Sequence, residues 1–257
     1  MTPVSALNND PQNTLHLWCA FPDDLLDPAA AEACMALLNE EERARWQRFR
    51  PERRQREYLA THALARTALS HYRPIAPQDW QFAKNAYGKP SPAPDCGLRF
   101  NLSNSLGLVV CLVADAPVEV GVDVEAQSRA GEIASVARRV FSAAELAQLD
   151  ALTETEKPDR YLSLWTLKEA YIKACGMGMS LPLEKISFLF DSSGSARLEI
   201  AASVDRDAAR WRFRWLDHAG HRIAMVAEGT AGWGLELLEI RPATGLPNRV
   251  LVERGRM

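Results

Sequence analysis

Apolar and polar residues alternate strictly along the stretch from Val118 to Glu125. Valines stand at 118, 120, 122 and 124, and the positions between them hold Glu119, Gly121, Asp123 and Glu125. This alternation predicts a β-strand with one apolar face. Its polar face has two open interpretations: it faces water, or it presents Asp123 and Glu125 side by side to a metal ion.

Further strand patterns lie on either side of this stretch. They occupy residues 80–84, 98–103 and 106–114 before it, and 186–190, 196–201, 210–216 and 221–229 after it. His218 and His221 have the spacing of a metal-ligand pair, but the sequence DHAGHR around them is typical of a hairpin turn. No third ligand accompanies them, so a turn is the favoured interpretation.

Two segments of the chain match when one is moved 103 residues along the other. Asn39 then pairs with Ser142, and Glu42 pairs with Glu145. Each pair is a cap residue followed three positions later by glutamate, which is the capping-box signature of a helix start. Both copies predict a short capped helix, a loop and a longer helix, followed by strands.

The duplication predicts an α+β protein built from two similar halves. We expect an N-terminal half at 15–117 and a C-terminal half at 118–235. A loose tail at 1–14 precedes them, and an extension at 236–257, with two prolines and a basic end, follows them.

Composition narrows the class of protein. The chain has 257 residues, 47% of them hydrophobic and 25% charged, with a net charge of -3. This balance gives no global electrostatic reason to expect nucleic acid or an anionic membrane as partner. Seven arginines between Arg43 and Arg56 face only Glu52 in that segment, which indicates a local anion site.

Cysteine usage and hydropathy favour a cytoplasmic protein. The five cysteines are widely spaced and form no C-x-x-C pair, which is typical of a reducing compartment. The longest apolar run, residues 106–114, is too short to cross a bilayer.

The segment RYLSLWTLKEAYIKACG predicts a helix on which Glu169 and Lys173 share one face. One interpretation is an ordinary salt bridge at the edge of the core. In the other, Glu169 is a third metal ligand or a general base, and Lys173 holds a phosphate. The helix alone leaves both open, and the glycine at 176 predicts its end.

Two loops carry further candidate residues. NAYGKPSP, residues 85–92, predicts a turn that presents Lys89. FNLSNS, residues 100–105, ends a strand in small polar residues, which either bind a phosphate or simply form a turn.

Five motifs occur together and in order: YGKP, FNLSNS, GVDVE, FSAAE and WTLKEAYIKACGMG. In this combination the chain resembles the long, two-half 4'-phosphopantetheinyl transferases, over about residues 15–229. The resemblance implies two α+β halves with an active site between them. It also implies Mg²⁺-dependent transfer of phosphopantetheine from coenzyme A to a serine of an acyl or peptidyl carrier protein, with release of 3',5'-ADP.

The resemblance also assigns roles to individual residues. The implied Mg²⁺ ligands are Asp123, Glu125 and Glu169, with Glu169, directly or through a water, as the candidate base. The implied coenzyme A contacts are Arg45 at the 3'-phosphate, Lys84 and Lys89 at the nucleotide end, and Asn101, Ser103, Asn104 and Lys173 at the phosphates. Two positions depart from the family pattern: Asn104 replaces a histidine, and Glu42 replaces a basic residue.

The same residues leave two other functions to test. One is a Mg²⁺-dependent nucleotide phosphohydrolase, and the other is a non-catalytic relative that binds coenzyme A or a carrier. For the transferase, we expect residues 128–142, with Arg138 and Arg139, to meet an acidic carrier domain. The competing interpretation of this segment is an amphipathic helix packed on the second half. Because one chain holds both halves, we expect a monomer.

Overall fold

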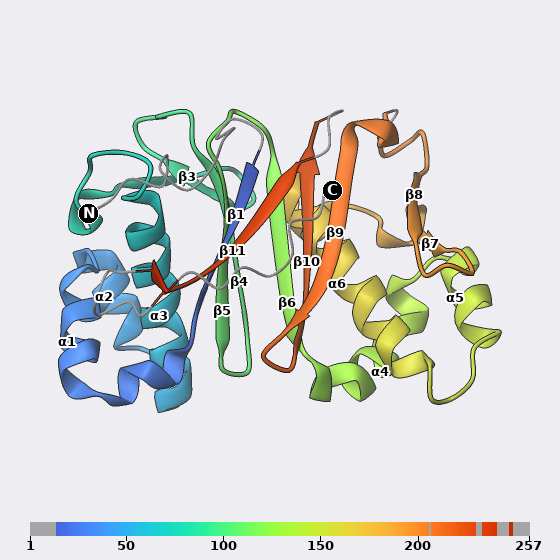
Figure 1. Cartoon of the computed structure of the whole chain (residues 1–257), viewed down its shortest axis with the longest axis horizontal. Helices are drawn as coiled ribbons and strands as arrows, with labels where there is room; N and C mark the ends of the chain where they lie inside the picture. Colours follow the sequence, from blue (N-terminus) through green and yellow to red (C-terminus); the bar gives the residue numbers. More distant parts are fainter. Residues whose placement is uncertain (1–13, 206, 230–232, 241–246, 249–257) are drawn as a thin grey trace.

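The computed structural model describes residues 14–205, 207–229, 233–240 and 247–248. Two sheets stand side by side in the middle of the molecule, and helices cover their outer flanks (Figure 1). The fold is α+β, as predicted. Of the predicted tail at 1–14, all but Thr14 lies outside the described residues.

The N-terminal part of the chain forms most of the first sheet and the helices that cover it. Its helices are α1 (Pro28–Ala36), α2 (Glu40–Trp46) and α3 (Glu52–Leu69). Its strands are β1 (Thr14–Ala20), β2 (Phe82–Lys84), β3 (Pro90–Pro92), β4 (Arg99–Ser105) and β5 (Leu108–Ala114). Two strands from later in the chain, β11 (Gly234–Ile240) and β12 (Pro247–Asn248), join this sheet, whose order is β12-β11-β1-β5-β4. Strands β2 and β3 form a separate hairpin around the predicted turn.

The next part of the chain, which begins with the strand predicted from the valine alternation, forms the second sheet and the helices that cover it. Its helices are α4 (Ala130–Val140), α5 (Ala143–Asp150) and α6 (Lys157–Cys175). Its strands are β6 (Val120–Ala126), β7 (Ile186–Phe190), β8 (Ala196–Ile200), β9 (Trp211–His218) and β10 (His221–Glu228). Here the sheet has the order β6-β10-β9, and the predicted hairpin joins β9 to β10.

The end of the chain differs from the expected extension at 236–257. Residues Gly234–Ile240 form β11, which pairs in parallel with β1. A further short strand, β12 (Pro247–Asn248), pairs with β11. Leu235, Leu237 and Leu238 are almost fully buried, and their burial holds β11 in the N-terminal sheet.

Both predicted capping boxes are present. The Asn39 side chain accepts the backbone N–H of Glu42 at the start of α2, and Ser142 does the same for Glu145 at the start of α5, with both reciprocal bonds formed. Each glutamate also ties its short helix to the longer one: Glu42 pairs with Arg66 (2.6 Å) and Glu145 with Lys168 (2.7 Å). The duplication therefore extends to the packing of the helices.

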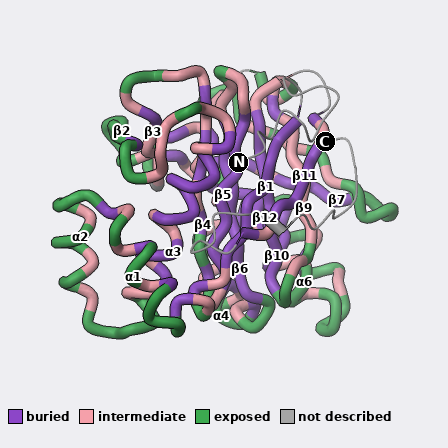
Figure 2. Tube along the Cα trace, turned by 60° about the vertical axis from the view of Figure 1, so that its left-hand side comes forward, coloured by how far each residue is buried: buried purple, intermediate pink, exposed green. Residues whose placement is uncertain are grey.

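The valines of β6 face the core between the two sheets. Val120, Val122 and Val124 are at most 1% exposed and pack with Leu15 and Leu17 of β1. Figure 2 shows this buried centre, with exposed segments on the outer helices. Asp123 and Glu125 are only 5% and 7% exposed, so the polar face of β6 is buried and does not face water.

Candidate active site

The site lies where β4 and β6 run side by side. Backbone N–H groups of β6 donate to side chains of β4: Val122 to Asn101 (2.9 Å), Val124 to Ser103 (3.3 Å) and Ala126 to Ser105 (3.2 Å). The polar positions of FNLSNS therefore bond to the backbone of GVDVE. This seam joins the two sheets and places the serines beside the carboxylates.

Asp123 is bound on one oxygen only. Its Oδ1 accepts hydrogen bonds from Ser103 Oγ (2.9 Å) and Lys173 Nζ (2.7 Å). Its Oδ2 is buried and has no hydrogen-bond partner among the described residues. Burial raises the pKa of Asp123, while Lys173 opposes that rise. An unpaired buried carboxylate oxygen is unfavourable unless a further donor or a cation reaches it.

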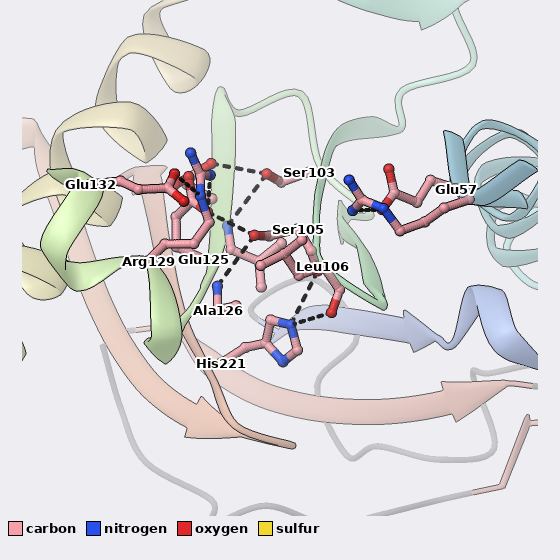
Figure 3. A network of polar contacts seen from close by, with 12 residues as sticks. Glu57, Ser103, Ser105, Leu106, Glu125, Ala126, Arg129, Glu132 and His221 are labelled. Carbon is pink, nitrogen blue, oxygen red and sulfur yellow. Dashed lines mark hydrogen bonds and ion pairs between the residues drawn. The ribbon is translucent and has the colours of Figure 1, made fainter. Parts of the chain in front are cut away.

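Glu125 is held in the same manner. Its Oε2 accepts hydrogen bonds from Ser105 Oγ (2.7 Å) and Arg129 Nη1 (2.6 Å). Arg129 Nε also donates to Glu132 (2.9 Å), so the guanidinium lies between the carboxylates of Glu125 and Glu132 (Figure 3).

Glu169 lies on α6, which packs against β6. Burial, followed by the charge of Asp123, raises its pKa from 4.5 to about 7; the charge of Glu125 adds to the rise, and Lys173 opposes it. The influence of both β6 carboxylates shows that the predicted acidic residues share one electrostatic environment. One of the two interpretations of this helix was a salt bridge between Glu169 and Lys173, but the Lys173 ammonium pairs with Asp123.

The side chains of the three predicted ligands do not converge on one point. Within the described part of the chain, no three His, Cys, Asp or Glu side chains are gathered closely enough to hold a metal ion. Without a cation, mutual repulsion of the carboxylates opposes such convergence. The open Oδ2 of Asp123 and the raised pKa of Glu169 nevertheless fit a divalent cation, which prefers carboxylate oxygens and would relieve both.

The predicted nucleotide-binding residues separate in the structure. Arg45 and Lys84 line one cavity of about 280 Å³, bounded by α2, α3 and strands β2 to β4. Lys89 instead donates to Glu119 (2.5 Å) and to the carbonyl oxygens of Ala174 and Val120. Lys89 thus fastens the β2–β3 hairpin to the second half of the molecule.

Glu42, where the family resemblance expected a basic residue, also lines the cavity with Arg45. Burial acts to raise its pKa, but hydrogen bonds with His62, the Asn39 backbone and Arg66 outweigh that effect and lower the pKa to about 2. The carboxylate is therefore ionised, and its charge is compensated within the protein.

Of the remaining predicted contacts, Asn101 is buried and serves the seam, whereas Asn104 is exposed at the end of β4. Helix α4 is amphipathic, as one interpretation predicted. Ile133 and Ala137 are buried in the core of the second half, and Arg138 and Arg139 are exposed.

Known proteins resemble this chain over most of its length. A family model described as the 4'-phosphopantetheinyl transferase superfamily matches residues 119–226. The 4'-phosphopantetheinyl transferase HetI of Nostoc sp. is 30% identical over 85% of this chain and 89% of its own length. A Bacillus subtilis 4'-phosphopantetheinyl transferase is 31% identical over 72% of this chain and 81% of its own. The chain belongs to this family. The transferase Sfp of B. subtilis strain 168, at 28% identity, covers 74% of this chain and 83% of its own.

The matched segment of this phosphopantetheinyl transferase family member runs from β6 to β10. It contains Asp123, Glu125, Glu169 and Lys173, and it ends before β11. No helix within the described residues has the length and apolar character needed to span a membrane.

Sequence reasoning missed three residues of the seam: Ser105, Arg129 and His221. Ser105 continues the alternation of Asn101 and Ser103, and that periodicity was a usable signal. Arg129 follows the strand on a short helical turn, and His221 Nε2 lies 3.1 Å from the Ser105 carbonyl oxygen (Figure 3). No local pattern indicates these last two contacts.

Proposed function

We propose that this protein transfers 4'-phosphopantetheine from coenzyme A to a serine of a carrier protein and releases 3',5'-ADP. The observation that carries the proposal is the junction at Asp123. There a serine of β4, a carboxylate of β6 and a lysine of α6 lie within hydrogen-bond distance of one another, beside a buried carboxylate oxygen that receives no hydrogen bond from the described residues.

Asp123, Glu125 and Glu169 would hold Mg²⁺. A divalent ion held by these residues would supply positive charge to neutralise the charge that develops on the leaving group. Asp123 Oδ2 and Glu125 Oε1, which accept no hydrogen bond from the described residues, are the atoms available on β6, and Glu169 lies on α6.

Lys173 binds and orients the phosphates. Its ammonium donates to Ser103 Oγ (2.8 Å) and to Asp123, and it is 27% exposed, so a phosphate oxygen reaches it without unfolding of the site. A fixed positive charge at this point favours the more negative transition state. Ser103 keeps Lys173 and Asp123 in register.

Glu169 accepts the proton of the attacking serine, directly or through a water. A general base is most effective when its pKa lies near the working pH. Without a cation, burial and the neighbouring carboxylates raise the pKa of Glu169 to about 7. A bound Mg²⁺ would lower that pKa and keep the carboxylate ionised, as a proton acceptor must be.

The nucleotide end of coenzyme A occupies the cavity beside α2 and α3. Arg45 and Lys84 supply positive charge at its rim, while Tyr58, Phe82 and Phe100 supply aromatic surface for the base. In this assignment Lys89 acts indirectly, by holding the hairpin that carries Lys84.

The carrier docks on α4. Arg138 and Arg139 form an exposed basic end on this helix, and carrier domains are acidic around their serine. The chain would act as a monomer, because both flanks of the site come from one molecule.

Mass spectrometry of an apo carrier protein, incubated with this protein, coenzyme A and Mg²⁺, tests the proposal. We expect the carrier to gain the mass of phosphopantetheine. Glu169→Gln is expected to reduce the transfer rate at least about 100-fold, because it removes the base and a ligand. Glu154→Gln, a change at an exposed glutamate in the loop before α6, is the matched control and retains the rate.

Three outcomes contradict the proposal. Release of phosphate from coenzyme A without a modified carrier indicates a hydrolase. Binding of coenzyme A without any reaction indicates a non-catalytic protein. An active Glu169→Gln variant removes Glu169 from the chemistry.

A further inference from the structure

The carboxylates of Asp123 and Glu125 are held by the same combination of groups. In each, one oxygen receives a hydroxyl of β4 and a basic side chain: Ser103 and Lys173 for Asp123, Ser105 and Arg129 for Glu125. The second oxygen is left open in both. Oδ2 of Asp123 is buried without a partner, and Oε1 of Glu125 accepts no hydrogen bond from the residues described.

This arrangement fixes where the open oxygens point. An ionised carboxylate only accepts hydrogen bonds, so two donors on one oxygen restrain the rotation of the whole group. Residues 123 and 125 lie on the same face of β6, so both restrained carboxylates lie on one side of the strand. Such supporting contacts are what orient metal-binding side chains.

The contacts to Glu125 are well protected. The Glu125 side chain is 10% exposed, and Ser105 is 5% exposed. The backbone N–H of Ala126 donates to Ser105 Oγ, and His221 Nε2 lies close to the Ser105 carbonyl oxygen, so the serine itself is held on two sides. By contrast, Glu132 is 68% exposed, and its pairing with Arg129 contributes little.

We propose that Ser105 and Arg129 are positioning residues that aim Glu125 at the divalent cation. They do for Glu125 what Ser103 and Lys173 do for Asp123. Because Arg129 stands directly before α4, the first turn of that helix is fastened to a carboxylate of the site. The inference rests on the proposed function, since that function supplies the cation.

Manganese binding to the full chain, followed by electron paramagnetic resonance of free Mn²⁺, tests this without catalysis. Ser105→Ala and Arg129→Gln are each expected to weaken Mn²⁺ binding by about 10- to 100-fold, the usual effect of losing a group that orients a metal ligand. Ser105→Thr, which keeps the hydroxyl, is expected to restore most of the affinity. Arg129→Lys is expected to lose less than Arg129→Gln.

The sign of the Arg129→Gln result separates positioning from competition. If Coulomb forces alone mattered, removing a positive charge near the cation would strengthen cation binding, because it removes a repulsion. Weaker Mn²⁺ binding therefore supports positioning, whereas stronger or unchanged binding overturns it. Unchanged binding in Ser105→Ala overturns the role of the serine.

Controls separate this proposal from loss of fold and from the proposed function. Arg197→Gln removes an exposed arginine of β8 and should leave Mn²⁺ binding unchanged. Urea unfolding of each variant shows whether a loss of affinity follows loss of structure. If the wild type transfers phosphopantetheine and the variants bind Mn²⁺ normally, only the positioning proposal fails. If the wild type binds Mn²⁺ but transfers nothing, only the proposed function fails.

Discussion

The charge on Glu169 opposes folding at neutral pH. Its pKa is 4.5 in the unfolded chain and about 7 in the folded protein, so the folded state binds more protons between these values. Stability contributed by this group therefore falls as pH rises from 4.5 to 7, and it stays low above 7. A site that accumulates negative charge for a cation is expected to behave in this way.

Glu169→Gln should consequently stabilise the metal-free protein at pH 8. The shift of the Glu169 pKa corresponds to a gain on the order of 2–3 kcal/mol in the free energy of unfolding, which should vanish near pH 4. Urea unfolding in the presence of a chelator, at both pH values, measures it. Added Mg²⁺ should stabilise the wild type more than the variant. A variant less stable than the wild type at pH 8 without metal contradicts the electrostatic account of Glu169.

At the residue scale, spacing predicts what lies on one element. The alternation in β6 placed Asp123 beside Glu125, and that proximity is present in the structure. Spacing does not predict Lys89, whose partners Glu119 and Ala174 are distant in sequence. Nor does it show that the amide of Asn101 is used by the backbone of β6. Such contacts depend on how elements from different parts of the chain meet.

At the scale of elements, Gly121 sets the approach of α6 to β6. A Cβ atom at this position would lie 2.0 Å from the carbonyl oxygen of Ala170 and 2.4 Å from the nitrogen of Ala174. These are backbone atoms, which cannot move without shifting the helix. Glycine in GVDVE therefore brings Glu169 and Lys173 close to Asp123.

Gly121→Ala is expected to move α6 away from β6. We predict a loss of about 1–3 kcal/mol in the free energy of unfolding from overpacking. Transfer activity should fall by a larger factor than stability explains, because the groups of the site separate. Gly131→Ala, where a Cβ meets nothing within 4 Å, is the control and should be neutral or slightly stabilising. Full activity in Gly121→Ala would mean that the distance from α6 to β6 does not govern the site.

Helix ends were the most predictable elements. Both capping boxes and the stop at Gly176, where φ is 66°, follow from local sequence. The strands β1 and β11 were not predicted. In β1 all residues are buried, and its sequence, TLHLWCA, alternates over only four residues before three apolar ones, which is too short a signal for a half-exposed strand.

At the scale of the whole molecule, the two copies of the helix pair have taken different roles. In the second copy the pair of Glu145 and Lys168 is completely buried. In the first copy Glu42 and His62 retain 13% and 28% exposure beside a cavity. The sequence predicted the duplication but not which copy of the helix pair would border a cavity. The cavity also depends on the side chains of β2 to β4 that line it.

We propose that the seam between β4 and β6, with α6 across it, binds one divalent ion and the diphosphate of coenzyme A. A crystal structure of the complex with coenzyme A and Mn²⁺, with the ion located by anomalous scattering, tests it most directly. We predict one ion about 2.1–2.2 Å from oxygens of Asp123, Glu125 and Glu169, with the diphosphate against Lys173. An ion or a diphosphate bound elsewhere, with Asp123 Oδ2 still without a partner, would contradict the account.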